Sequence, residues 1–298
     1  MINGVIIPAI VFFNADGGVD YEKCRAHMKW AVSKGVRGLF VTGTYGSGYL
    51  LTLEERVKIY ETAYDLTKNV RNAFVIAHTG CIDTASAVFL TRRASEIGIK
   101  AASAISPLIY KYSEDDIKRY YMTLLESADI DLYAYNNPDL TGRALSVNII
   151  EQLRAAGVKG LKDSSVDTEL AKRFCETDSS DFQYIPGTVS KWIEFRRLGA
   201  CAMIAGMCNY APEPVVALYD ASFKDTVEAH RIYDIISGLS PGLKFGNSLV
   251  SSHICLAARG FDSAGMRAPL HVDLERDKGK VRKAKELMDD AFARLRLS

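Results

Sequence analysis

The 298-residue sequence lacks several patterns that identify common classes of protein. No apolar run approaches the length of about 18 residues that a membrane span needs, and the N-terminus has no basic segment followed by an apolar one and a cleavage site. Lys and Arg (37) balance Asp and Glu (36), and no long run carries one sign of charge. We therefore expect a cytoplasmic protein with neither a membrane nor a nucleic acid as partner.

Cysteine motifs are missing as well. The six cysteines lie far apart and form no C-x-x-C pair, which fits neither a zinc site nor a disulfide framework in a chain this large. We expect them to be reduced thiols buried in the core: Cys24, Cys81, Cys175, Cys201, Cys208 and Cys255.

The motifs of nucleotide and metal chemistry are also absent. No G-x-G-x-x-G follows the first apolar run (residues 4–13), no Walker or H-E-x-x-H motif occurs, and the five histidines are dispersed. A Rossmann-like open sheet, which alternating strands and helices would also allow, predicts such a glycine-rich turn. The sequence therefore favours a protein without a nucleotide, another cofactor or a metal.

What the sequence does contain is an alternation of short strand-like runs and longer amphipathic stretches. Asp20 is a predicted N-cap for a helix over residues 21–34, and Ser or Thr with an acidic residue three positions on predicts helices over 54–67 and 114–128. Parallel strands need such crossovers, and eight of them close a barrel. The predicted strands are residues 4–8, 38–42, 73–77, 102–106, 132–135, 158–162, 182–185 and 202–205.

The chain is longer than the roughly 250 residues of a typical barrel. From about residue 212 onward it shows helical patterns, notably over residues 226–236, 249–258 and 278–297, and no convincing strand. We predict a (β/α)8 TIM barrel over residues 1–211, completed and extended by C-terminal helices over residues 212–298.

Two strands carry reactive groups near their C-terminal ends, where TIM barrels place their active sites. Side chains alternate between the faces of a strand, so Tyr135 and Lys162 should point into the barrel if Ala134 and Leu161 pack on the helices. A buried lysine has a lowered pKa, and its neutral amine is a nucleophile. The alternatives are a structural tyrosine, and a lysine paired with Asp163 or extended to the rim.

A turn with three glycines follows the second predicted strand, at Gly43-Thr44-Tyr45-Gly46-Ser47-Gly48. Glycines let backbone N–H groups approach a small anion. An ordinary turn is the alternative interpretation.

Taken together, these elements resemble the dihydrodipicolinate synthase/N-acetylneuraminate lyase family of class I, pyruvate-dependent barrel aldolases. The resemblance extends from Pro8 to Pro269. It rests on five segments in the family's order: Gly43-Thr44-Tyr45-Gly46, Tyr135-Asn136-Asn137-Pro138 with Thr141-Gly142, Gly160-Leu161-Lys162, the stretch from Gly199 to Asn209, and Arg267-Ala268-Pro269.

The resemblance implies roles for particular residues. The Lys162 amine would form a Schiff base with the keto carbon of pyruvate or of a 2-keto-3-deoxy acid, and Tyr135 would carry protons as general acid and base. Thr44 would act with them and, with the N–H of Tyr45, hold the carboxylate, while the carbonyl of Gly206 would approach the substrate. The protonated imine supplies the electrophile, so neither metal nor cofactor is implied. The family also implies a homotetramer.

Departures from the family's pattern bear on the substrate. Tyr45 replaces a threonine and Ser47 a glutamate, and the Gly-Ser-Gly form resembles 2-keto-3-deoxygluconate aldolases. We expect Ser47 to line the substrate site. Leu140 stands where dihydrodipicolinate synthases place an arginine that grips a dicarboxylic substrate, and a leucine cannot form that pair.

A further departure concerns the neighbouring subunit. Many members place a tyrosine two residues after the proline that matches Pro107, and this tyrosine reaches the site of another subunit; here Ile109 occupies that position. Tyr110 is the candidate to replace it as a substrate contact.

The sequence thus favours a Schiff-base lyase that cleaves a 2-keto-3-deoxy sugar acid to pyruvate and an aldehyde. The alternatives with the same chemistry are 4-hydroxy-tetrahydrodipicolinate synthase, which joins pyruvate and aspartate semialdehyde, and a dehydratase of keto-deoxy sugar acids. A keto-acid sensor without turnover is the alternative outside enzymes, although binding alone requires neither Lys162 nor Tyr135.

Overall fold

The computed structural model describes residues 1–175 and 181–297, and it confirms the predicted TIM barrel. All of its ladders between strands are parallel, in the order β7-β6-β5-β4-β3-β2-β1-β8. The strands are β1 (Gly4–Pro8), β2 (Gly38–Val41), β3 (Phe74–His78), β4 (Ala101–Ile105), β5 (Asp131–Asn136), β6 (Gly160–Asp163), β7 (Gln183–Pro186) and β8 (Ala202–Ile204).

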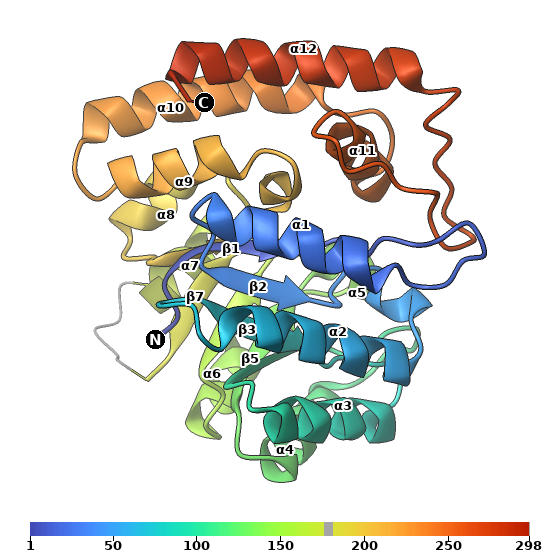
Figure 1. Ribbon diagram of the computed structural model, residues 1–298. Coiled ribbons are helices and arrows are strands. Elements are labelled where there is room, and N and C mark those ends of the chain that lie inside the picture. The colour runs from blue at the N-terminus through green and yellow to red at the C-terminus, as the bar shows by residue number, and fades with distance from the viewer. Residues whose placement is uncertain (176–180, 298) are drawn as a thin grey trace.

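The first and last strands of the sequence pair with each other, with Gly4 opposite Ala202 and Ile6 opposite Ile204. Helices surround the strands (Figure 1). They are α1 (Tyr21–Ser33), α2 (Leu53–Thr67), α3 (Thr84–Ile97), α4 (Glu114–Ser127), α5 (Pro138–Thr141), α6 (Val147–Ala155), α7 (Thr168–Cys175) and α8 (Trp192–Arg197), with short 3-10 turns η1 (Gly48–Leu50) and η2 (Gly206–Asn209).

The predicted helix starts are correct to within one residue. Asp20 accepts a hydrogen bond from the N–H of Lys23, and capping boxes open α2 and α4. The predicted end of the second strand differs, since β2 stops at Val41. The reason is local: Thr42 takes a left-handed backbone with φ of 55°, which no strand can continue.

The C-terminal helices form the layer at the top of Figure 1, where α10 and α12 lie against each other above α9 and α1. They are α9 (Pro212–Ala221), α10 (Thr226–Gly242), α11 (Ser248–Ala257) and α12 (Lys278–Leu295). Helix α10 is six residues longer than the predicted 226–236, because its buried face continues through Leu239. Within residues 1–175 and 181–297, none of the helices is both long and apolar enough to cross a membrane.

The Arg267 guanidinium joins this C-terminal part to the barrel. It makes a two-point pair with the carboxylate of Glu55 in α2 and donates to the carbonyl oxygens of Gly17 and Leu50. A guanidinium matches a carboxylate at two points, which a lysine cannot do. The Arg-x-Pro segment thus anchors the chain beside the turn that follows β2.

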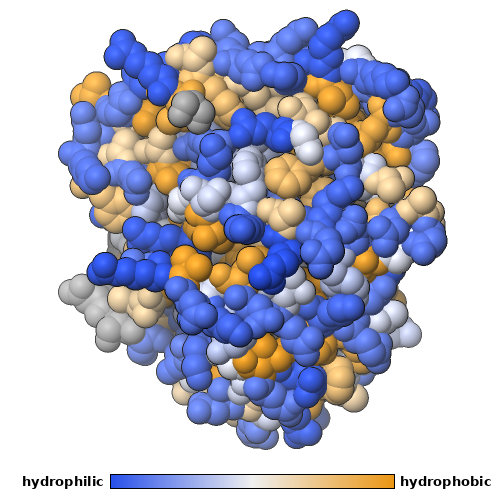
Figure 2. Space-filling view, viewed as in Figure 1, coloured by the Kyte–Doolittle hydropathy of each residue, from blue (hydrophilic) through white to orange (hydrophobic). Residues whose placement is uncertain are grey.

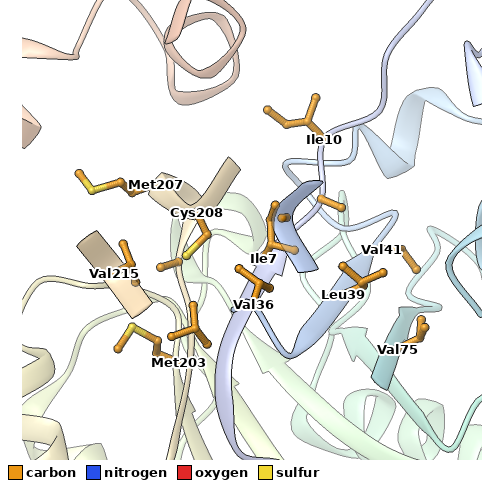
Figure 3. Packing of buried hydrophobic residues seen from close by; sticks show 14 of the residues in the cluster. Ile7, Ile10, Val36, Leu39, Val41, Val75, Met203, Met207, Cys208 and Val215 are labelled. Atoms are coloured by element: carbon orange, nitrogen blue, oxygen red, sulfur yellow. The ribbon is translucent and has the colours of Figure 1, made fainter. Parts of the chain in front are cut away.

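Alternation along the strands separates two cores. Residues of one parity, such as Tyr133 and Tyr135, fill the barrel interior, whereas Leu132 and Ala134 belong to the layer between strands and helices. Figure 3 shows this outer layer, where Ile7, Leu39 and Met203 of the strands gather with Val215 of α9. The sequence prediction for the two faces of β5 is confirmed.

The outer face seen in Figure 2 is largely hydrophilic, with small, separated apolar patches. The prediction that all six cysteines are buried is correct for four of them. Cys24, Cys81, Cys208 and Cys255 are buried as predicted, but Cys175 and Cys201 are partly exposed. Cys175 ends α7, and a helix end at the surface covers its last side chain less completely than a core position does.

Candidate active site

Lys162 lies in the barrel interior, as predicted, on the strand β6 next to β5. Its side chain is buried, and its Nζ lies 3.5 Å from the ring centroid of Tyr135 and 4.3 Å from that of Phe40. Burial lowers the pKa of Lys162, and the proximity of Tyr135 and Asp163 offsets this lowering only in part. Burial therefore makes the neutral, nucleophilic form of the amine more accessible than in an exposed lysine.

The carboxylate of Asp163 has its partners elsewhere. It accepts hydrogen bonds from the Asn136 amide, the Ser165 hydroxyl and the Tyr184 hydroxyl. These partners are found on the face of β6 opposite to Lys162, since consecutive residues of a strand point to opposite faces.

Gly160 lets β6 pack closely against its neighbours β5 and β7 near Lys162. A Cβ at this position would lie 2.3 Å from the carbonyl oxygen of Gln183 and 2.9 Å from the ring of Tyr133. Both distances are too short for a Cβ atom to fit, so close packing explains the glycine of the G-x-K pattern.

Tyr135 lies directly opposite Lys162 in the ladder between β5 and β6. Its hydroxyl is 3.3 Å from Oγ1 of Thr44 and accepts a hydrogen bond of 2.9 Å from Nδ2 of Asn137. Burial raises the pKa of Tyr135, but the charge of Lys162 and the hydrogen bonds from Thr44, Lys162 and Asn137 outweigh burial and lower the pKa to about 8. The structure thus brings three predicted residues, Lys162, Tyr135 and Thr44, into one cluster.

The glycines of the turn after β2 are required by close packing. A Cβ on Gly48 would lie 1.9 Å from the carbonyl oxygen of Thr42, and one on Gly46 would lie 3.0 Å from backbone atoms of Thr42 and Ala9. Ser47 is buried within the turn, where its N–H donates to the carbonyl of Thr44. The compact turn fixes Thr44 beside Tyr135.

Tyr45 extends from this turn toward Gly206 in η2, which follows the strand β8 on the other side of β1. A Cβ at position 206 would lie 2.4 Å from the Cζ and the hydroxyl oxygen of Tyr45. The Tyr45 hydroxyl is hydrogen-bonded to the side chain of Ser248, the first residue of α11. The carbonyl of Gly206, the predicted substrate contact, accepts a hydrogen bond of 3.1 Å from Asn209. The C-terminal helices thus contribute to this wall of the mouth.

Tyr110 and Ile109 lie apart from this cluster. Tyr110 is 71% exposed and packs edge-on against Tyr112, and Ile109 is 75% exposed with a left-handed φ of 83°. Within one chain, Tyr110 therefore belongs to the surface and not to the surroundings of Lys162.

Leu140 lies in α5, the short helix after β5, and Arg143 follows that helix. Leu140 is 46% exposed and carries no charge. Arg143 donates to the carbonyl of Tyr112 and pairs with the carboxylate of Glu114 at the start of α4. Its guanidinium is thus bound to another loop.

His78 is a residue of the site that the sequence reasoning missed. Its buried ring lies 5.9 Å from those of Tyr135 and Phe40, and its Nε2 has no hydrogen-bond partner among the described atoms. Burial, with the positive charges of Arg56 and Lys162, lowers the pKa of His78 well below its ordinary value, so the imidazole is neutral. The parity of Ile76 would have indicated an inward side chain, but the predicted strand ended at residue 77.

Arg56 of α2 contacts His78 on its backbone carbonyl and its Nδ1 atom. Its guanidinium donates to the carbonyl oxygens of Gly80 (3.1 Å) and His78 (2.5 Å), and it contacts Nδ1 of His78 and Sγ of Cys81. Arg56 is only 2% exposed. A buried guanidinium bonded to carbonyls adds positive charge to this end of the barrel.

Comparisons with known proteins match nearly the whole chain. The model of the dihydrodipicolinate synthetase family matches residues 1–287. A DapA-like lyase of Halobacterium salinarum, itself described as uncharacterized, is 27% identical over 271 residues, which cover 90% of this chain and 88% of that protein. A 4-hydroxy-tetrahydrodipicolinate synthase of Alcanivorax borkumensis is 27% identical over 272 residues, covering 91% and 92%.

Solved structures match over almost the whole chain. The structure of a catalytic lysine mutant of the sialic acid aldolase of Ruminococcus gnavus has a TM-score of 0.90 at 25% identity, covering 97% of this chain and 96% of that one. The dihydrodipicolinate synthase of Aquifex aeolicus has a TM-score of 0.87 at 25% identity, covering 97% of both chains.

Proposed function

Because the chain belongs to the dihydrodipicolinate synthetase family of class I, pyruvate-dependent aldolases and lyases, we propose that it cleaves a 2-keto-3-deoxy sugar acid to pyruvate and an aldehyde through a Schiff base on Lys162. The observation that carries this proposal is the buried amine of Lys162 against the ring of Tyr135, whose hydroxyl is bonded to Thr44. A relative of the same fold is named a sialic acid aldolase with a catalytic lysine, which supports the assignment.

The first step is attack of the neutral Lys162 amine on the C2 keto carbon. Loss of the keto oxygen as water leaves an iminium between Nζ and C2. One hydrogen of that water comes from the amine, and Tyr135 delivers the other, because its side chain lies beside Lys162 in the barrel interior. The N–H groups of Thr44 and Tyr45 bind the substrate carboxylate.

Carbon–carbon cleavage follows from the iminium. Tyr135 in its deprotonated form removes the proton of the C4 hydroxyl, the C3–C4 bond breaks, and its electron pair moves into the iminium to give an enamine. C4 leaves as the aldehyde. Protonation of the enamine at C3 and hydrolysis of the imine release pyruvate and restore Lys162.

A sugar acid is the favoured substrate because the mouth offers hydroxyl groups, whereas Leu140 and Arg143 provide no available charge for a second carboxylate. Tyr45 and Ser248 provide hydroxyls at one wall. Leu140 is neutral and Arg143 is paired with Glu114. A second carboxylate would lose most of its hydration without a two-point partner.

The second candidate is 4-hydroxy-tetrahydrodipicolinate synthase, and it is favoured by the names of several relatives. It shares the Lys162 imine but needs aspartate semialdehyde as the acceptor. A keto-acid dehydratase shares the same first step. A homotetramer, carried over from the family, and cytoplasmic residence stay predictions.

Reduction of the imine tests the proposal. The protein is incubated with pyruvate and borohydride, digested, and analysed by peptide mass spectrometry. We expect one reduced pyruvate adduct, on Lys162, and none in Lys162→Ala. A wild-type protein without this adduct would contradict both the lyase and the synthase, and would leave a keto-acid sensor. Steady-state assays with pyruvate and glyceraldehyde, aspartate semialdehyde or N-acetylmannosamine then identify the aldehyde.

A further inference from the structure

Two uncharged side chains of different kinds are hydrogen-bonded to the Tyr135 hydroxyl. Nδ2 of Asn137 lies 2.9 Å from the hydroxyl oxygen, and Oγ1 of Thr44 lies 3.3 Å from it. A threonine hydroxyl can donate or accept, whereas an amide nitrogen only donates. Asn137 therefore presents a donor to Tyr135 in every protonation state.

The phenol oxygen can make only a limited number of hydrogen bonds, so the two partners act differently when Tyr135 loses its proton. A neutral tyrosine carries one hydrogen and two accepting lone pairs. With one lone pair occupied by Asn137, the neutral phenol can donate its proton to Thr44, and after deprotonation Thr44 can turn its own hydrogen to the oxygen. The bond from Asn137 persists in both states but is stronger to the charged oxygen.

We propose that Asn137 is a positioning residue that holds the oxygen of Tyr135 ready to accept the proton of the substrate C4 hydroxyl. This role rests on the proposed lyase reaction. Asn137 itself neither gains nor loses a proton, because its amide is neutral at all relevant pH values.

The backbone fixes Asn137 firmly enough for this role. Its carbonyl oxygen accepts hydrogen bonds from the N–H groups of Leu140 and Thr141 and from Oγ1 of Thr141, all at 3.1 Å. Pro138 follows and opens α5. The side chain thus begins from a backbone held by three bonds at the end of β5, and little freedom is lost when it contacts Tyr135.

The other ionisable groups around Tyr135 come from three elements. Lys162 of β6 lies over the ring, and its charge favours the phenolate. His78 of β3 packs edge-on against the ring and is neutral, because burial lowers its pKa. Tyr45 and Tyr49, from the segment after β2, are neutral because burial raises their pKa values. Lys162 thus contributes its charge and a hydrogen bond, and Thr44 and Asn137 contribute further hydrogen bonds.

Both partners of the Tyr135 hydroxyl belong to its own chain. Ile109, at the position from which many family members extend a tyrosine into another subunit, carries no hydroxyl and is exposed. Asn137 therefore donates a hydrogen bond to the Tyr135 oxygen from within the same chain, without a residue from a second copy.

The test compares Asn137→Asp and Asn137→Leu with Asp139→Asn, an exposed change two residues away that does not contact Tyr135. The readout is kcat at saturating substrate as a function of pH, because it reports the base in the imine complex. Asn137→Asp keeps the size but places a negative acceptor beside the oxygen. We expect the pKa of the low-pH limb, which reports this base, to rise by one unit or more, with about a tenfold loss of kcat per unit at pH 7. Asn137→Leu loses the donor alone and shifts less, and Asp139→Asn keeps the wild-type profile.

Borohydride trapping with pyruvate distinguishes the possible failures. If the wild type forms no adduct, the proposed lyase reaction is wrong. If all variants form the adduct and Asn137→Asp and Asn137→Leu keep the wild-type profile, the role of Asn137 is wrong and the lyase reaction stands. An ultraviolet titration of the phenolate, taken as the difference between each protein and its Tyr135→Phe counterpart, gives the same comparison without turnover. An unshifted Tyr135 titration in Asn137→Asp would overturn the role directly.

Discussion

The Nζ atom of Lys162 lies 3.5 Å from the ring centroid of Tyr135, its register partner on the adjacent strand. The face of an aromatic ring attracts a cation, so the protonated lysine is stabilised at this site even though burial disfavours its charge. The same charge makes Tyr135 a stronger acid. The two residues therefore titrate as a coupled pair, and each change of protonation at one is felt at the other.

Removal of the Tyr135 hydroxyl should separate imine formation from turnover. We expect Tyr135→Phe to slow kcat by about 10²–10⁴, the range of a general acid or base, because the ring remains over Lys162 while the proton carrier is lost. The fraction of protein trapped by borohydride and pyruvate should stay measurable. The checks are steady-state assays and intact-mass spectrometry, and an unchanged kcat would remove Tyr135 from the mechanism.

Replacement of the buried amine should stabilise the fold. Burial lowers the folded-state pKa of Lys162, so the unfolded chain binds its proton more tightly. The wild-type protein is therefore most stable above the pKa that Lys162 has in the unfolded chain. It loses stability as the pH falls from that value through the folded-state pKa of Lys162. We expect Lys162→Met to raise the free energy of unfolding at neutral pH by about 1–4 kcal/mol.

Urea unfolding at several pH values measures this gain. The advantage of Lys162→Met over the wild type should shrink as the pH rises toward the ordinary lysine value. A methionine variant that is less stable at pH 7 would show that the native amine is well solvated or well paired.

Tyr45 and Gly206 should show a steric coupling. A Cβ at position 206 would meet the end of the Tyr45 side chain at 2.4 Å. Gly206→Ala should therefore displace Tyr45 from Ser248, cost about 1–3 kcal/mol of stability, and change the kcat/KM ratio between short and long aldehydes.

A double-mutant cycle isolates this contact. Tyr45→Thr removes the ring, so Gly206→Ala should cost little in that background. We expect a coupling of about 0.5–3 kcal/mol from thermal or urea unfolding. Additive effects of the two changes would mean that the ring does not touch position 206 in solution.

Loss of Arg56 should destabilise the β3 end of the barrel. Arg56→Met leaves the carbonyl of Gly80 without this donor and weakens the surroundings of His78. We expect a loss of about 2–4 kcal/mol, since each buried unpaired group costs about 1–3 kcal/mol. Arg93→Ala, which breaks an exposed pair with Glu96, serves as the control and should stay within about 0.5 kcal/mol of wild type. Equal losses in both variants would contradict the buried role of Arg56.

The barrel and its reactive pair could be predicted because they depend on local periodicity. Alternation along β5 and β6 placed Tyr135 and Lys162 inward with no knowledge of their neighbours. His78 was missed because the predicted third strand ended at residue 77, whereas β3 ends at His78. The contacts of Asn137 with Tyr135 and of Tyr45 with Gly206 depend on loop dihedrals and long-range packing, which the sequence pattern does not encode.

Arg56 shows a second limit. It stands between Glu55 and Val57 in the first turn of an amphipathic helix, where an arginine ordinarily faces solvent. Only the arrival of the Gly80 and His78 carbonyls, more than twenty residues along the chain, makes its burial favourable.

The pairing of β1 with β8 has a consequence for the protein during its synthesis. Gly4 and its partner Ala202 lie 198 positions apart in the sequence, so the ribosome makes β8 long after β1. Until then one edge of β1 lies open, and contacts so distant in sequence form slowly. Each nascent chain therefore carries Thr44, Tyr135 and Lys162 before they can share a closed barrel, and we expect it to acquire imine chemistry only after β8 has docked.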